Sequence, residues 1–537
     1  MRRHYNGDEA LALGAITAGV DMATGYPGTP GTGVLQALID QATASDMYVE
    51  WSTNERVALE MAIGASMAGS RALVCTKSVG MNVMLDPLMC LNLTGVHGGL
   101  VILLGDDPGA YGSQNDQDTR NLTSMLEIPM FEPASIVEGY SMICSAFDLS
   151  ERFNTALIIR VTRSYMQQVE EIIPAADIPP RAALKMARDA YRFVPYPGNA
   201  VEMHRKLHER LGVIEAWADK STYNEMIGSG PMGIVAAGFV YQKLIDVLGD
   251  VRQDELRILK LSCLYPFPRG LINRFLEGCD QVLVLEEVDP YVENQLKATA
   301  FDLGYREKIL GKVSGDVNWE GELYRWQIEE ALARYIPALI PGHSYLVENE
   351  ALERPTKADH CAKYAYEEIL NHFLRAADTL GQRPIIIADP GCMVKVADQL
   401  DAKFAIGSAV ALASGVNKSR KDEKVIAFIG DSAFFHSTLP AICNTAYNQS
   451  DVLIVVLDNR GAASTGLQPT PGVGVDVFGN PAPKLDIPEI ARACGVNFLQ
   501  QVDAEASEAE IRLAIESGFG TKGLAMLIFR IKPTQHR

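Results

Sequence analysis

Short apolar runs alternate with longer amphipathic stretches along the whole chain. The runs are nearly continuous stretches of branched aliphatic residues, which is typical of buried parallel strands. The clearest are residues 72–75, 100–104, 156–161, 233–237, 281–285, 426–429 and 453–457. Strands separated by helical stretches are typical of a parallel sheet with helices on both faces. The pattern therefore predicts an α/β protein built from doubly wound domains.

The last two of these runs form the most informative unit. Gly430-Asp431-Ser432 ends one run, Asp458-Asn459 ends the next, and residues 437–449 between them have a helical pattern. Such crossovers are almost always right-handed, so the strands run parallel and their polar ends emerge at the same sheet edge, where ligands bind. Asp431 and Asn459 offer hard oxygen ligands that suit Mg²⁺ shared with phosphate groups. We therefore expect a bound diphosphate cofactor, although either dipeptide alone is also typical of an ordinary turn.

Breaks in the pattern divide the 537 residues into parts. Residues 1–180 form a first α/β domain, and 181–230 are polar enough to be a linker. Residues 231–345 form a smaller α/β domain. Residues 346–537 form a third α/β domain that contains Asp431 and Asn459.

Composition narrows the classes of function. The formal net charge of −19 disfavours nucleic acid or an anionic membrane as a partner, since either needs a basic face. The nine cysteines include no Cys-x-x-Cys pair, so neither a zinc finger nor a ferredoxin-type cluster is expected. No signal segment and no run of membrane-spanning length is visible, which predicts a cytoplasmic protein with reduced thiols.

Four motifs give the chain a specific resemblance. They are Tyr26-Pro27-Gly28-Thr29-Pro30, Asn54-Glu55-Arg56-Val57-Ala58, Gly112 to Asp118, and Gly430 to His436. Together they resemble the alpha-subunit family of indolepyruvate:ferredoxin oxidoreductases, within the 2-oxoacid:ferredoxin oxidoreductase superfamily. The resemblance covers nearly the whole chain. It implies three α/β domains: a pyrimidine-binding and a diphosphate-binding thiamine diphosphate fold flanking a transketolase C-terminal-like domain.

The resemblance implies thiamine diphosphate and Mg²⁺ as cofactors, held mostly by the third domain. The implied metal ligands are the side chains of Asp431 and Asn459 and the backbone carbonyl of Gly461. Further implied cofactor contacts are Gly391, Cys392, Gly407, Ser408, Gly430, Ser432, Ala433, Thr465, Gly466 and Gln468. Small residues before a helix let backbone N–H groups approach a diphosphate. Ordinary turns are an alternative explanation of Gly391-Cys392 and Gly407-Ser408.

The catalytic residue implied by the resemblance is Glu55. In the family a glutamate at this position bonds the aminopyrimidine of thiamine and promotes the tautomer that removes the C2 proton. An alternative is that Ser52 to Glu55 is a capping box that opens a helix with Val57, Met61 and Ala68 on one face.

The resemblance also places the substrate near residues 26–33, with Thr29 facing its oxo group. The candidates for binding the substrate carboxylate are Lys77, Gln114, Asn115 and Gln117, with Arg120 as a further one. A solvated Lys77 is the alternative. His204 and His208 stand four positions apart, but the charged residues around them favour a solvated helix over a metal site.

These features predict a thiamine diphosphate- and Mg²⁺-dependent enzyme. It would oxidatively decarboxylate an arylpyruvate- or indolepyruvate-like 2-oxoacid and form an acyl-coenzyme A. The family's Cys-Pro-x-Cys-Pro-His segment is represented only by Asp359-His360-Cys361-Ala362, and the sequence predicts a chain that lacks the family's C-terminal ferredoxin-like domain. We therefore expect no iron–sulfur cluster in this chain.

The implied electron carriers are iron–sulfur or flavin centres on other chains. A gamma-type (beta) subunit is the expected partner, around a dimeric core of a hetero-oligomer. The alternatives are a non-oxidative decarboxylase or carboligase, which needs no electron exit, and a non-catalytic scaffold subunit.

Overall fold

The structure is a computed structural model that describes residues 3–42, 47–174, 184–186, 188–249, 255–340, 345, 350–356 and 359–532. The chain forms two compact units. Unit 1 comprises Met1–Val49 and Glu55–Lys357, and unit 2 comprises Glu50–Asn54 and Ala358–Arg537. The predicted domain boundaries at residues 180 and 346 lie outside the described residues and stay predictions.

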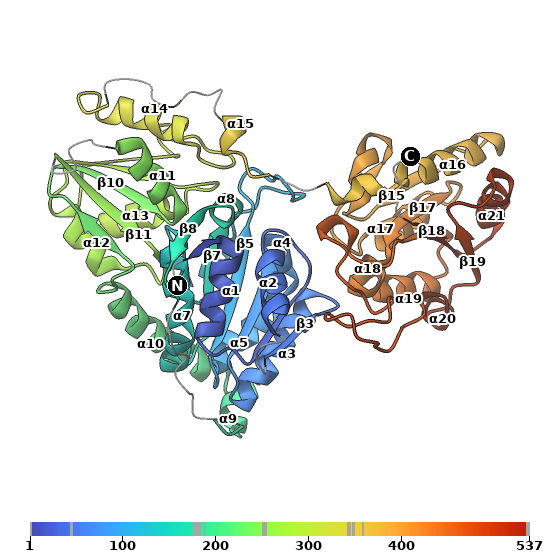
Figure 1. The fold of residues 1–537 in the computed structure, drawn as a ribbon, viewed down its shortest axis with the longest axis horizontal. Coiled ribbons are helices and arrows are strands. Elements are labelled where there is room, and N and C mark those ends of the chain that lie inside the picture. The colour runs from blue at the N-terminus through green and yellow to red at the C-terminus, as the bar shows by residue number, and fades with distance from the viewer. Residues whose placement is uncertain are drawn as a thin grey trace. The chain divides into compact units, whose positions relative to one another are not determined.

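The first sheet of unit 1 has seven strands in the order β12-β6-β7-β5-β4-β2-β3; β3, β5 and β7 are labelled in Figure 1. The strands are β2 (Met22–Gly25), β3 (Tyr48–Trp51), β4 (Ala72–Lys77), β5 (Leu100–Asp106), β6 (Met130–Phe131), β7 (Leu157–Thr162) and β12 (Cys263–Tyr265). The pairings β2–β4, β4–β5, β5–β7 and β6–β7 are parallel, and β12 pairs with β6 antiparallel. A small antiparallel pair, β1 (Arg3–Asn6) and β8 (Val169–Ile172), lies outside this sheet.

Helices cover both faces of the first sheet. Side chains alternate between the two faces along a strand. On one face, Val74 of β4 and Ile102 of β5 belong to a core with residues of α3, α4 and α5. The helices α2 and α7 also contact the strands, and α1 packs on both of these helices. The helices are α1 (Gly7–Thr17), α2 (Thr32–Ala42), α3 (Glu55–Ala68), α4 (Ser78–Val83), α5 (Leu85–Thr94), η1 (Thr119–Leu122), α6 (Thr123–Leu126), α7 (Ile136–Phe153) and α8 (Arg163–Met166).

The second sheet of unit 1 has five strands in the order β14-β13-β10-β11-β9. These strands are β9 (Glu225–Ile227), β10 (Met232–Ala237), β11 (Leu256–Leu261), β13 (Gln281–Leu285) and β14 (Lys308–Leu310). The remaining helices of unit 1 are α9 (Ala190–Phe193), α10 (Ala200–Ala218), α11 (Phe239–Leu248), α12 (Arg269–Leu276), α13 (Tyr291–Asp302), α14 (Arg325–Tyr335) and α15 (Glu350–Glu353). One hydrophobic core joins both sheets, because it contains Val74 and Ile102 as well as Val235 and Leu259. This shared core explains why the two sheets form one unit.

Unit 2, orange to red in Figure 1, has a six-stranded sheet in the order β16-β15-β17-β18-β20-β19 with every pairing parallel. The strands are β15 (Ile385–Ala388), β16 (Ala402–Lys403), β17 (Val425–Gly430), β18 (Val452–Asp458), β19 (Phe498–Asp503) and β20 (Leu524–Arg530). The helices are η4 (His360–Lys363), α16 (Tyr366–Thr379), η5 (Cys392–Gln399), α17 (Ala409–Ser419), α18 (Asp431–Ala433), the π-helical turn η6 (Phe434–Thr438), α19 (Leu439–Tyr447), η7 (Ala463–Thr465), α20 (Ile487–Ala493) and α21 (Glu508–Gly520). Two separate cores line its faces, one with Ile426 and Phe428 and the other with Val425 and Ala427.

The predicted α/β class is therefore confirmed, and each predicted strand lies within or overlaps an observed one. Val57, Met61 and Ala68, which were predicted to share one face of α3, do not form its buried face: Val57 is half-buried, Met61 and Ala68 are exposed, and the helix buries Ala58, Leu59 and Ala62. The side of α3 that packs on β2 and β4 therefore combines alanines with a leucine.

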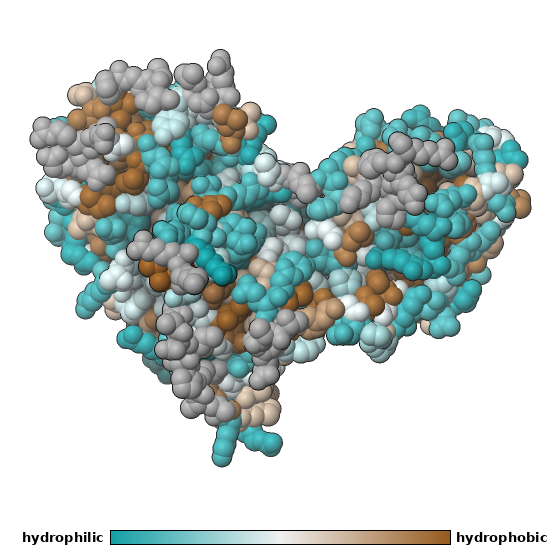
Figure 2. All heavy atoms as spheres, in the orientation of Figure 1, coloured by the Kyte–Doolittle hydropathy of each residue, from teal (hydrophilic) through white to brown (hydrophobic). Residues whose placement is uncertain are grey.

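On the face of the molecule in Figure 2, hydrophilic residues cover much of the surface and hydrophobic residues appear as separate patches. Among the described residues, no helix combines the length and the apolar character needed to cross a bilayer.

Two helical glycines of unit 1 should respond oppositely to alanine. A Cβ at Gly14 of α1 would lie 2.2 Å from Ile143 Cγ2, whereas one at Gly212 of α10 would meet nothing within 4 Å. Gly14→Ala should lower the free energy of unfolding by about 1–3 kcal/mol through overpacking. Gly212→Ala should raise it by about 0.5–1 kcal/mol through helix propensity. Urea unfolding of the full chain measures both, and changes of the same sign would contradict this packing.

Candidate functional site

The polar ends of β17 and β18 lie side by side at one sheet edge of unit 2. The two strands pair in parallel with Gly430 opposite Leu457. Asp431 follows β17 as the first residue of α18, and Asn459 follows β18 directly. The βαβ unit predicted from the sequence is therefore present, with Asp431 and Asn459 on neighbouring strand ends.

Three oxygen atoms converge at this edge. The Asn459 carboxamide oxygen lies 2.9 Å from Asp431 Oδ1 and 2.7 Å from the Gly461 carbonyl oxygen, while its nitrogen donates to the Tyr366 hydroxyl at 2.6 Å. Rotating the amide would turn the first two contacts into hydrogen bonds. In the present orientation, the spacing instead approaches the edge of about 3 Å that an octahedral Mg²⁺ shell has when metal–oxygen distances are about 2.1 Å. This donor set therefore fits a hard divalent cation without any amide rotation.

A backbone hydrogen bond and burial hold the Asp431 side chain in place. Its Oδ2 accepts a hydrogen bond from the Gly461 N–H at 2.9 Å, and the residue is 3% exposed. Burial, followed by the nearby charge of Asp458, raises the pKa of the Asp431 carboxyl to about 8. A bound cation would stabilise the charged form of this buried carboxyl and would lower its pKa again.

The residues around Asp431 and Asn459 form two ordered turns. Ser432 and Ala433 lie in α18, which runs into the π-helical turn η6, a feature that is frequent at functional sites. Thr465 Oγ1 donates to Gln468 Oε1 at 2.7 Å, and Gln468 Nε2 returns a bond to the Thr465 carbonyl at 2.9 Å. Gly466 between them has a φ of 125°. Hydrogen bonds between its own residues therefore hold the loop after Gly461 in a compact turn.

The Gly407-Ser408 turn is occupied by a carboxylate of the protein. Asp389, at the end of β15, accepts hydrogen bonds from the backbone N–H groups of Gly407 and Ala409, each at 2.9 Å. The Ser408 N–H donates to Ala405. Burial raises the pKa of the Asp389 carboxyl to about 7. The predicted diphosphate contacts at Gly407 and Ser408 thus stay predictions, with these N–H groups already paired.

Cys392 is not the reduced thiol that the sequence predicted. Its Sγ forms a disulfide with Cys361, and the two Cα atoms are 5.3 Å apart. Both residues belong to the same hydrophobic core of unit 2, although they are far apart in the sequence. The expectation is therefore wrong for this pair, and only the backbone of Gly391-Cys392 is left for the predicted cofactor contact.

In unit 1, Glu55 opens α3 and is 6% exposed. A Cβ at Gly80 would lie 2.7 Å from Glu55 Oε1, so the carboxylate lies directly against the start of α4. A capping box would need Glu55 three residues inside the helix, with the Ser52 hydroxyl accepting from it. The helix begins at Glu55 instead, and Ser52 Oγ donates to Glu50 Oε1 at 2.6 Å. The capping-box alternative is therefore wrong.

Lys77 and the loop 26–33 lie together near Glu55. Lys77 ends β4, is 8% exposed and donates to the Gly112 carbonyl at 2.8 Å. A Cβ at Gly28 would lie 3.1 Å from Lys77 Cβ, so this glycine permits the close approach. Thr29 is half-buried in the same loop. The solvated-lysine alternative is wrong.

The other carboxylate-binding candidates divide into two groups. Gln117 exchanges hydrogen bonds with Asn82 at 2.8 and 2.9 Å and accepts one from Asn115 at 3.3 Å, while Gln114 is exposed. Arg120 is fully buried and forms ion pairs with Asp118 at 2.6 Å and Glu286 at 3.0 Å. Arg120 is therefore a structural residue, which corrects its placement among the substrate candidates.

Three residues near these sites were not identified from the sequence. They are Tyr366 beside Asn459, Asp389 under Gly407, and Asp8, whose carboxylate lies where a Cβ of Gly33 would be. A strand end followed by aspartate, as at Ala388-Asp389, was the one available signal. Tyr366 and Asp8 lie on helices far from the motifs in sequence.

Comparisons with known proteins agree with this geometry. Residues 13–213 match the family model described as pyruvate flavodoxin/ferredoxin oxidoreductase, thiamine diP-bdg. Residues 400–529, which include Asp431 and Asn459, match the model described as thiamine pyrophosphate enzyme, C-terminal TPP binding domain.

Relatives extend the match over the chain. The chain is 36% identical over 513 residues to indolepyruvate oxidoreductase subunit IorA of Methanothermobacter thermautotrophicus, covering 93% of this chain and 81% of the relative. It is 32% identical over 527 residues to the subunit of the same name from Pyrococcus abyssi, covering 93% and 80%. A solved 2-oxoglutarate:ferredoxin oxidoreductase from Magnetococcus marinus aligns with a TM-score of 0.47 and 17% identity over 63% of this chain and 65% of that one.

Proposed function

The chain belongs to the family of indolepyruvate oxidoreductase subunit IorA, and from this membership we propose that it uses thiamine diphosphate and Mg²⁺ to decarboxylate an arylpyruvate- or indolepyruvate-like 2-oxoacid oxidatively. The observation that carries the proposal is the convergence of the Asp431, Asn459 and Gly461 oxygens after two parallel strands. A set of three oxygens, one of them anionic, suits Mg²⁺ bridged to a diphosphate.

Each part of the chain has a role in this proposal. Bound thiamine diphosphate would supply the carbon that adds to the 2-oxo group and the sink for the electrons of decarboxylation. Glu55 would hold a proton at the aminopyrimidine nitrogen, and its burial keeps water away from that bond. Lys77 would pair with the substrate carboxylate, with Thr29 facing the oxo group and Gln114, Asn115 and Gln117 nearby.

The acyl group would pass to coenzyme A and the electrons to another chain. Relatives are named as subunits, which supports a partner subunit. We propose a gamma-type (beta) subunit and iron–sulfur or flavin centres outside this chain, in a hetero-oligomer with a dimeric core.

The test is an assay of the native complex purified with its associated chains. Indolepyruvate or another arylpyruvate should reduce an artificial electron acceptor only when coenzyme A is present, and an acyl-coenzyme A should accumulate. Aldehyde release without coenzyme A or acceptor would instead identify a non-oxidative decarboxylase. A complex that binds no thiamine diphosphate and turns over no 2-oxoacid would identify a scaffold.

Replacing Lys77 tests the substrate site. Lys77→Met keeps the stem that packs on Gly28 and removes the ammonium group. Hydrogen bonds to charged groups contribute about 1.5–3 kcal/mol, so KM for the 2-oxoacid should rise by roughly 10- to 150-fold with a smaller change in kcat.

The matched control is Lys308→Met, at an exposed position of β14. It should leave KM unchanged. An unaltered KM in Lys77→Met, with a thermal midpoint close to that of the wild type, would remove Lys77 from the substrate site.

A further inference from the structure

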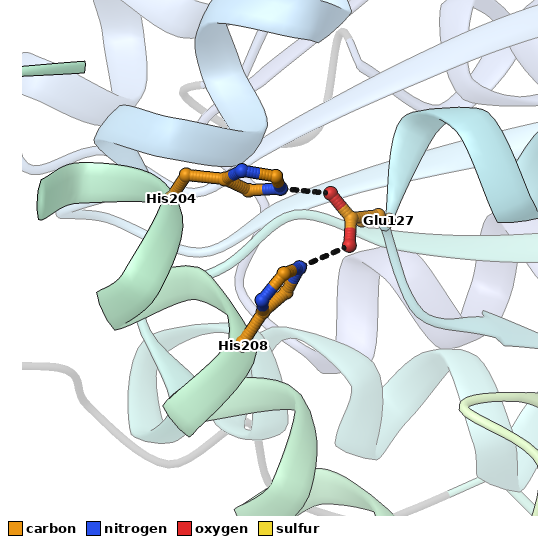
Figure 3. Close-up of side chains that lie close together, drawn as sticks. All are labelled: Glu127, His204 and His208. Carbon is orange, nitrogen blue, oxygen red and sulfur yellow. Dashed lines mark hydrogen bonds and ion pairs between the residues drawn. The ribbon is translucent and has the colours of Figure 1, made fainter. Parts of the chain in front are cut away.

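Two histidines and a glutamate of unit 1 point toward one another at its surface (Figure 3). His204 and His208 stand one turn apart on α10, and Glu127 follows α6. The Nε2 atoms of His204 and His208 lie 2.8 Å from Glu127 Oε2 and Oε1, respectively. The three ligand atoms all lie within 4.8 Å of one another.

The surrounding structure fixes both sides of this cluster. α10 buries Met203, Leu207 and Leu211, and the two histidines lie beside this buried face with side chains that are 50% and 57% exposed. The two rings have centroids 4.3 Å apart. Glu127 has a φ of 52°, a left-handed conformation that is uncommon for glutamate and that sets the direction in which its side chain leaves the end of α6.

We propose that Glu127, His204 and His208 form a binding site for a divalent transition-metal ion. Zn²⁺ is the ion that fits these ligands best. Two imidazole nitrogens four positions apart on a helix, joined by one carboxylate, are a common zinc donor set. Imidazole suits zinc, cobalt, nickel and copper rather than magnesium. Three protein ligands leave a further coordination position for water or for a group from another molecule.

The charges nearby permit a cation here. Arg205, which lies between the two histidines in sequence, is paired with Glu202 at 2.6 Å and also with Glu209, and Lys206 lies 3.8 Å from Glu202. Glu202 and Glu209 therefore engage these positive groups. Two histidines and one shared carboxylate without a metal would be an exposed hydrogen-bonded cluster, and such exposed pairs contribute little to stability.

The site has a structural consequence. In the chain, α10 follows β7 of the first sheet and precedes β9 of the second sheet, and it packs against α5. A metal held by both α10 and the residue after α6 would fasten this connecting helix to the first sheet's layer of helices. This role is independent of the proposed thiamine diphosphate chemistry.

The test is metal binding by the full chain, prepared without an affinity tag and stripped with a chelator. Calorimetric titration with Zn²⁺ should show one site in the wild type that is weakened at least about 10-fold in each of His204→Ala, His208→Ala and Glu127→Gln, since even indirect partners of a metal ligand contribute about 10- to 100-fold. Arg205→Ala on the same helix and His372→Ala in unit 2 are controls that should bind Zn²⁺ like the wild type. Zn²⁺ should also raise the thermal midpoint of the wild type but not that of the three variants.

Co²⁺ distinguishes this site from the exposed thiols of Cys90 and Cys443. Binding at Glu127, His204 and His208 should give visible absorption without the near-ultraviolet band of cobalt thiolate, and the visible absorption should vanish in His208→Ala. The proposal is overturned if all three variants bind Zn²⁺ as tightly as the wild type does, or if Co²⁺ shows only the thiolate band.

Discussion

Asp431→Ala should abolish retention of thiamine diphosphate and Mg²⁺ by the purified protein. The change removes the one anionic member of the oxygen cluster formed with Asn459 and Gly461. Mg²⁺ demands nearly ideal octahedral geometry and is reluctant to lose water, so two neutral oxygens alone should not hold it against a diphosphate. The measurement is the amount of thiamine diphosphate and magnesium that remains per chain after gel filtration.

Two further variants separate charge from folding. Asp431→Asn keeps an oxygen that can accept from the Gly461 N–H, so its fold should persist while its cofactor content still falls. Asp422→Ala, in an exposed turn of the same unit, is the matched control and should retain the cofactor fully. Stoichiometric thiamine diphosphate bound with normal affinity in Asp431→Ala would show that the cluster is not its metal site.

The geometry at Asp431 was predictable because it depends on topology more than on side-chain detail. Once 426–429 and 453–457 are taken as neighbouring parallel strands, the residues that follow them must both emerge at the carboxyl edge of the sheet. The observed parallel pairing, with Gly430 opposite Leu457, agrees with this expectation. Gly461 was predictable only through the family resemblance, since nothing in a lone glycine marks its carbonyl as a ligand.

Contacts between distant segments could not be predicted in the same way. His204 and His208 were visible as a pair, but Glu127 is 77 residues from His204, and no local pattern links them. The Cys361–Cys392 disulfide and the pairing of Asp389 with the Gly407 N–H depend on how η4, η5 and α17 pack on the sheet. Arg120 illustrates the converse, because an arginine in a motif loop proved to be buried in ion pairs that only the assembled unit supplies.

Glu55→Gln should lower activity by roughly 10²- to 10⁴-fold, the usual loss when acid–base assistance is removed. Glutamine keeps the size of the side chain and can still hydrogen-bond, but it cannot exchange a proton with the aminopyrimidine nitrogen. The direct measurement is the rate at which the C2 proton of bound thiamine diphosphate exchanges with deuterium. This rate should fall with the activity, while the bound cofactor content stays close to that of the wild type.

The structure sharpens this experiment because α3 begins at Glu55 itself, which removes the capping box as a reason for a stability change. The thermal midpoint should therefore move little. Glu60→Gln, one turn along the same helix and paired with Arg56 at 2.8 Å on the surface, is the matched control and should leave exchange and turnover unchanged. If Glu55→Gln exchanges the C2 proton at the wild-type rate, the carboxylate beside Gly80 serves the packing of α3 against α4, and another group must activate the cofactor.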